Sequence, residues 1–107
     1  MSDSPLTFER HGAVAKLTLN RPQAGNAIDQ ALARALMEAS IVCDEDDAIR
    51  CVVLTGGGRL FCGGGDIGSF SAAGDNVPAL LKELTAYLHM AVSRFARMPK
   101  PLVTAIN

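Results

Sequence analysis

The residue types that could do chemistry gather in one glycine-rich stretch. Two glycine triplets, residues 56–58 and 63–65, lie on either side of Arg59-Leu60-Phe61-Cys62 and directly follow an apolar run. Glycine reaches dihedral angles that other residues avoid, and its lack of a side chain lets a ligand approach the backbone N–H groups. This concentration of glycine predicts a loop whose main chain contacts a ligand, with a plain flexible linker as the alternative.

Asp66, directly after the second triplet, indicates how those N–H groups are arranged. A carboxylate in this place is typical of a helix N-cap, so we expect it to cap a short helical turn. N–H groups gathered at the positive end of such a turn would suit an oxyanion that develops during a reaction.

The glycines also admit nucleotide-binding interpretations. Neither triplet is followed by the lysine and hydroxyl residue that a phosphate loop of the Walker type needs, so that motif is excluded. Gly63, Gly65 and Gly68 do fit the dinucleotide fingerprint, and Glu83 follows near the place of a ribose-binding acid. Glu83 falls within a predicted helix rather than at the end of a second strand, which disfavours a Rossmann oxidoreductase.

Cysteine and histidine offer a second kind of chemistry. Cys62 with His11 or His89 could form a nucleophilic pair, although a buried structural thiol and a surface histidine explain these residues more simply. The cysteines at 43, 51 and 62 lack the close spacing of a zinc or redox site, and the acidic run 44–47 has no oxygen-rich continuation for calcium. We therefore predict no metal, and reduced thiols as in the cytoplasm.

Apolar periodicity predicts the elements that position the glycine-rich loop. Residues 6–10 and 14–19 are typical of a hairpin, and an amphipathic helix follows from the N-cap Asp29, with the acidic run in its exit turn. Residues 51–54 and 102–106 are predicted as strands buried on both faces, 69–76 as a mobile segment, and 78–97 as a second helix. The alternation predicts an α/β fold with its ligand at loops 20–28 and 55–68.

Composition narrows the classes of protein and partner. The 107 residues suit one domain, and 49% of them are hydrophobic, enough to bury a core. Ten basic and eleven acidic residues give a formal charge of −1, which predicts neither nucleic acid nor an anionic membrane surface as a partner. No signal peptide or membrane-spanning run is apparent, so we predict a soluble protein of the cytoplasm.

Several motifs, in order along the whole chain, resemble the crotonase superfamily of enoyl-CoA hydratases and isomerases. Residues 52–56 and 61–67 are similar to its pattern V-x-L-T-G-x-G-x-x-F-C-x-G-x-D. Residues 19–28 look like its first coenzyme A loop, and residues 100–107 look like the strand before its next glycine-rich turn. The resemblance implies an α/β fold, a crotonase-like ββα-repeat spiral, of which residues 1–107 form the incomplete amino-terminal part of a single domain.

By this resemblance the chain acts on an acyl-CoA thioester through an enolate whose oxygen is stabilised in an oxyanion hole. Gly65 would donate its backbone N–H as one half of that hole. Coenzyme A would enter as part of the substrate, with no prosthetic group. Its predicted binding residues are Gly63, at the adenine, together with Ala24, Asn26, Asp66 and Ile67. The family more usually has Ala-Gly-Ala where residues 63–65 are all glycine, which keeps the donors in a looser loop.

The resemblance places other groups that the reaction needs beyond Asn107, namely the second oxyanion donor and the catalytic acids. We therefore expect the full-length protein to be a lyase or isomerase, and these 107 residues alone to be inactive. Homotrimers or hexamers are typical of the family but draw on its carboxyl-terminal half, so we do not expect this chain alone to form them. The alternative function is a truncated, non-catalytic module that binds an acyl-CoA or a partner.

Overall fold

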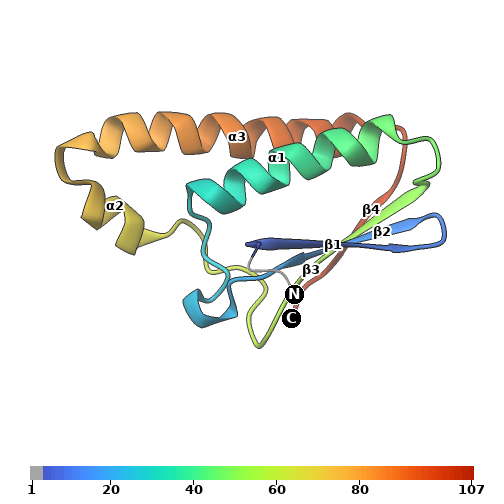
Figure 1. The fold of residues 1–107 in the computed structure, drawn as a ribbon, viewed down its shortest axis with the longest axis horizontal. Helices are drawn as coiled ribbons and strands as arrows, with labels where there is room; N and C mark the ends of the chain where they lie inside the picture. Colours follow the sequence, from blue (N-terminus) through green and yellow to red (C-terminus); the bar gives the residue numbers. More distant parts are fainter. Residues whose placement is uncertain (1–3) are drawn as a thin grey trace.

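A four-stranded sheet with two long helices on one face makes up the molecule, which a computed structural model describes from residue 4 to residue 107 (Figure 1). The strands are β1 (Leu6–His11), β2 (Val14–Leu19), β3 (Cys51–Gly56) and β4 (Leu102–Ala105), in that spatial order. β1 and β2 pair antiparallel as the predicted hairpin, whereas β2, β3 and β4 run parallel. The predicted α/β class is confirmed.

The helices are α1 (Gln30–Glu45), α2 (Ile67–Ala73) and α3 (Val77–Arg97), with short 3₁₀ turns η1 (Pro22–Ala24) and η2 (Gly74–Asn76). α1 begins where predicted, because Asp29 Oδ1 accepts the N–H of Leu32 at 2.9 Å. α3 begins with a proline in its first turn, where the missing N–H has no intrahelical role. α1 and α3 pack against each other over the sheet (Figure 1).

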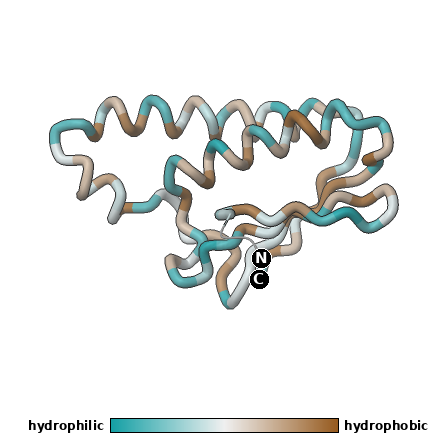
Figure 2. The backbone as a smooth tube through the Cα atoms, in the orientation of Figure 1, coloured by the Kyte–Doolittle hydropathy of each residue, from teal (hydrophilic) through white to brown (hydrophobic). Residues whose placement is uncertain are grey.

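The core lies between the sheet and this helix layer. Leu17, Leu32 and Val52 are among its fully buried side chains, one each from β2, α1 and β3. Hydrophobic residues recur along both long helices and along the strands (Figure 2); in the sequence, the helical spacing of apolar positions predicted the two long helices.

Two loop predictions were wrong. The segment 69–76 is helical, in α2 and η2, because Asp66 caps α2: its Oδ1 accepts the N–H of Ser69 at 3.3 Å. Asp44 and Glu45 belong to α1 rather than to its exit turn. Two cations offset their charge at the helix C-terminus, since Arg94 pairs with Asp44 at 2.9 Å and the Lys100 ammonium donates to main-chain carbonyls at the end of α1.

The burial predicted for two strands was also wrong. β4 lies at the edge of the described sheet, and Val103 and the following Ile106 are 51% and 73% exposed. β3 has Val52 fully buried under the helices and Val53 only half-buried on the opposite face. The difference arises because the described helices cover one face of the sheet. Within residues 4–107, no helix is long and apolar enough to cross a membrane.

Candidate functional site

The two loops predicted to hold a ligand meet at the carboxyl ends of β2 and β3. Because β2 and β3 are parallel, both loops leave the same ends of the strands. The Ile28 N–H donates to the carbonyl of Gly64 at 2.7 Å, and the Asp66 N–H donates back to the carbonyl of Ile28 at 3.0 Å. These bonds form a short parallel bridge between Ile28 and Gly65, and Gly63 adds a third bond, to the carbonyl of Gly25 at 2.9 Å.

The side chain of Asn26 fastens the same loops from within. It is fully buried, and its Oδ1 accepts the Arg21 N–H at 2.7 Å. Its Nδ2 donates to the carbonyls of Gly57 at 2.9 Å and Leu60 at 2.7 Å. Its backbone has φ of 54°, a left-handed conformation that asparagine tolerates better than most residues. The amide therefore holds the loops together, and the predicted part of Asn26 in coenzyme A binding remains a prediction.

Gly65 is an exposed residue of this framework. Within the described residues its N–H donates no hydrogen bond, although the neighbouring Gly63 and Asp66 amides both do. A β-carbon at Gly65 would lie 3.1 Å from two atoms of the Phe70 ring. An alanine methyl here would be in tight contact with the Phe70 ring, which would have to move by a few tenths of an ångström to admit it.

Arg21 joins the two helix N-caps beside the loops. Its Nη2 lies 3.0 Å from Asp66 Oδ2 and its Nε lies 3.6 Å from Asp29 Oδ2, while its Nη1 donates to the carbonyl of Ala27. The hydrogen bond from Arg21 is the main reason that the pKa of Asp66 lies below its ordinary value. Sequence reasoning missed this contact, because nothing in the spacing of Arg21 and Asp66 indicates that they meet.

A groove of about 490 Å³ opens between the two loops on the side of η1. Its walls are Pro22, Gly25, Gly58, Arg59 and Leu60. Ala24 is half-buried within η1 and directly precedes the groove residue Gly25. Gly63, the other predicted contact residue, is exposed. Ile67, at the start of α2, is 77% exposed. The groove thus combines small, apolar walls with one guanidinium group.

A second, apolar cavity of about 130 Å³ lies beneath the glycine loop, between the sheet and α3. Ile28, Phe61 and Cys62 line it from the loops, and Leu88 and Phe95 line it from α3. Cys62 therefore belongs to an apolar wall, as the simpler interpretation of this residue predicts.

Other candidates from the sequence are not brought together. His11 lies at the hairpin turn, at the opposite end of β2 from Cys62, and His89 lies on an exposed face of α3. Glu83 lies within α3 and accepts a hydrogen bond from the Tyr87 hydroxyl at 3.1 Å. Among the described residues, no group of three or more histidine, cysteine or acidic side chains could hold a metal ion.

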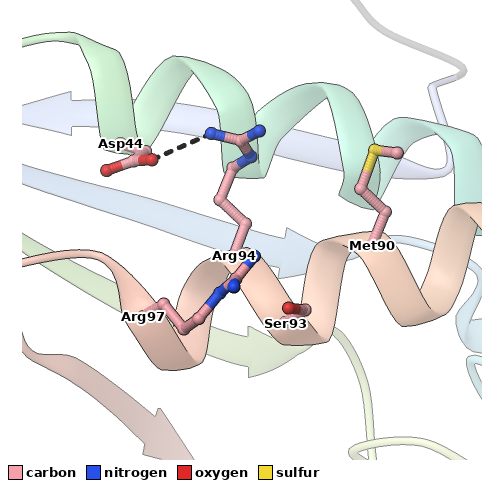
Figure 3. A pocket seen from close by; sticks show the side chains of 5 residues that line it. All are labelled: Asp44, Met90, Ser93, Arg94 and Arg97. Carbon is pink, nitrogen blue, oxygen red and sulfur yellow. Dashed lines mark hydrogen bonds and ion pairs between the residues drawn. The ribbon is translucent and has the colours of Figure 1, made fainter.

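A further pocket lies at the C-terminal ends of α1 and α3, away from the two loops. Met90, Ser93 and Arg97 line it beside the Arg94–Asp44 ion pair (Figure 3). The Asp44 carboxylate pairs with Arg94, one of the two arginines that line the pocket. We therefore interpret this pocket as part of the contact between the helices.

Comparisons with known proteins show which family the chain is similar to. The family model described as enoyl-CoA hydratase/isomerase matches residues 9–107. A 1,2-epoxyphenylacetyl-CoA isomerase of Escherichia coli is 36% identical over 88% of this chain and 36% of its own length. A probable enoyl-CoA hydratase of Rhodobacter capsulatus is 35% identical over 100% of this chain and 40% of its own. The chain thus spans well under half the length of these relatives.

The fold agrees as well. A crystal structure of an enoyl-CoA hydratase from Mycobacterium smegmatis superposes with a TM-score of 0.86 at 34% identity, covering 95% of this chain and 39% of that one. The crotonase-like architecture expected from the motifs is therefore confirmed for residues that carry both loops.

Proposed function

Because the chain belongs to the enoyl-CoA hydratase/isomerase family, within the crotonase superfamily that its motifs resemble, we propose that it binds an acyl-CoA thioester at the two loops. The observation that carries this proposal is that Gly65 is exposed and its N–H donates no hydrogen bond within the described chain, while the neighbouring residues are fixed by the bridge to Ile28. The thioester carbonyl oxygen would accept that N–H.

Such a donor serves chemistry in which negative charge grows on the carbonyl oxygen, as in an enolate. A fixed N–H dipole stabilises the charge without reorganising, and removal of one oxyanion donor typically lowers a rate by about 10²–10³. The flanking hydrogen bonds of Gly63 and Asp66 hold the peptide unit of Gly65 in one orientation. Gly65 is thus the proposed catalytic residue of this chain, acting through its main chain.

The groove between the loops suits the nucleotide part of coenzyme A. Its apolar walls, Pro22 and Leu60, offer contact area for a base, and the Arg59 guanidinium can pair with a phosphate. Gly63 and Ala24 lie in the loops that form it, and Asp66 and Ile67 follow the oxyanion donor. Coenzyme A is thereby bound as part of the substrate, and the proposed chemistry uses no separate prosthetic group.

The apolar cavity beneath the glycine loop offers a place for the acyl chain. Ile28 lines the cavity and also bridges to Gly65, so a thioester carbonyl at the N–H would direct its acyl group toward the cavity. Its volume of about 130 Å³ has room for a short chain.

The polypeptide of 107 residues is expected to bind its ligand without turnover. The structure brings two carboxylates to these loops, Asp29 and Asp66, and both accept a helix N–H with one oxygen and pair with Arg21 through the other. Neither is free to transfer a proton to the substrate. Activity as a lyase or isomerase, and assembly into trimers or hexamers, are proposed for the family's full-length proteins.

Two ligands that differ in one oxygen test the proposal. Acetyl-CoA and S-ethyl-CoA have the same nucleotide and the same two-carbon tail, but the thioether has no carbonyl. In calorimetric titrations we expect the wild-type chain to bind acetyl-CoA about fivefold more tightly, the value of one net hydrogen bond. Replacing Gly65 by sarcosine, introduced by peptide ligation at Cys62, should abolish the difference by removing the N–H.

The control for that experiment is the same ligated chain with sarcosine at Gly12, in the hairpin turn far from the loops. Equal affinities of the wild-type chain for the two ligands would refute the carbonyl contact. Incubation with an enoyl-CoA tests the other half of the proposal: measurable hydration by the 107-residue polypeptide would rule out the non-catalytic module.

A further inference from the structure

Gly65 owes its orientation to groups on both sides of it. The bridge to Ile28 fixes it against the first loop, and the N-cap Asp66 fixes it to α2. Neither of these contacts involves a residue of α1, although α1 begins only two residues after Ile28. A contact that joins Asp66 to the start of α1 would close this arrangement into one rigid unit.

Arg21 makes that contact. Asp29 and Asp66 cap their helices with Oδ1 in each case, at 2.9 Å and 3.3 Å from the amide nitrogens of Leu32 and Ser69. Each leaves Oδ2 for the guanidinium, at 3.6 Å and 3.0 Å. The caps and the ion pairs therefore use different oxygens, so Arg21 can be removed without removing either cap.

The pairing is sheltered from water. The side chains of Arg21, Asp29 and Asp66 are 18%, 25% and 17% exposed, whereas the i, i+4 pair of Arg34 with Glu38 on α1 is 63% and 61% exposed. Shielding strengthens a hydrogen-bonded ion pair, and exposed pairs contribute little. The main chain of Arg21 is held too, because its N–H donates to Asn26 and its carbonyl accepts from Ala24 and Asn26.

We infer that Arg21 is a positioning residue, which fixes the direction of the Gly65 N–H by tying the N-caps of α1 and α2 together. This role requires no contact between Arg21 and the thioester. The inference rests on the proposed function for its consequence in ligand binding, but its structural part can be measured without ligand.

The first test is amide hydrogen exchange in the ligand-free chain, followed by nuclear magnetic resonance. In Arg21→Met we expect the bridge amides, Ile28 and Asp66, to exchange about tenfold faster, the effect of losing a hydrogen bond to a charged group. The core amide of Leu17 should keep its rate. Arg34→Met is the matched control, and it should change neither.

The second test repeats the acetyl-CoA and S-ethyl-CoA titrations. Arg21→Met should bind S-ethyl-CoA within about twofold of wild type but lose the roughly fivefold preference for the carbonyl. Arg21→Lys, which retains a charge but cannot reach three partners in a plane, should recover part of that preference. Should Arg21→Met fail to fold, Arg21→Lys is compared with wild type in both tests.

The outcomes separate the two proposals. Unchanged exchange at the bridge, or equal acceleration at Leu17, would overturn the inference whatever the ligand titrations give. A loosened bridge with the carbonyl preference intact would also overturn it. Absence of that preference from the wild-type chain would overturn the proposed function instead, and with it any positioning role toward a thioester.

Discussion

Replacing Asn26 with alanine should destabilise the chain more than any surface substitution. The change leaves the N–H of Arg21 and the carbonyls of Gly57 and Leu60 without the fully buried amide that is their partner. Each group left without its partner costs about 1–3 kcal/mol when buried, so the three together should lower the free energy of unfolding by about 3–9 kcal/mol. Alanine at a φ of 54° adds about 1 kcal/mol of backbone strain.

Urea denaturation followed by far-ultraviolet circular dichroism measures this loss. Asn26→Gly removes the same hydrogen bonds without the strain, so it should be about 1 kcal/mol more stable than Asn26→Ala. The matched control is Asn76→Ala, because Asn76 is exposed and its side chain makes no cap hydrogen bond at α3; it should change stability by less than about 0.5 kcal/mol.

A loss smaller than about 1 kcal/mol for Asn26→Ala would refute the reasoning, because it would mean that these three groups find other partners easily. Domains of this size unfold with about 5–15 kcal/mol in total, so the expected loss approaches the whole stability. Under the expected outcome, the variant should therefore also lose its affinity for acetyl-CoA and S-ethyl-CoA alike.

Two further predictions concern charge. Arg59→Ala should weaken binding of both coenzyme A ligands about fivefold, with a smaller effect at high salt, because it removes a phosphate partner but not the Gly65 donor; titration at two ionic strengths checks this. The pKa of Asp66 is lowered in the folded chain, so its ionised carboxylate contributes to folding stability. That contribution is complete above pH 3.8, the ordinary pKa, and is lost as the pH falls through the lower pKa of the folded state. In Arg21→Met a carboxyl titration by nuclear magnetic resonance should therefore find the pKa of Asp66 raised toward 3.8.

Sequence patterns predicted the elements whose signal is local. The apolar positions of α1 and α3 repeat at helical spacing over many residues, and Asp29 and Asp66 act as the N-caps that their places indicate. The N-cap of α2 was predicted but its length was not, because its serine, alanine and glycine residues are not fully buried and show no apolar periodicity. The exposure of β4 was not predicted, because a short apolar run has the same sequence pattern whether one face or both faces of the strand are covered.

The site was predictable in part for the same reason. The glycine triplets and Asp66 are adjacent in sequence, so their joint role in presenting N–H groups could be inferred. The contacts of Arg21 with Asp66 and of the buried Asn26 amide with Gly57 and Leu60 could not be inferred, because these partners are 30 or more residues away and the residue types carry no sign of them. A single cation and a single amide have many possible surroundings, and only the fold selects one.

The span of the Asn26 contacts has a consequence for folding order. Its amide joins residues 34 positions apart, and closing a loop of that length carries an entropic cost that no local contact repays. The hairpin and α1 can form early from near neighbours, but the two loops can meet only after β3 has docked beside β2. We therefore expect the two loops to be among the last parts of the molecule to assemble, so that their contacts depend on cooperative folding of the sheet rather than on either loop alone.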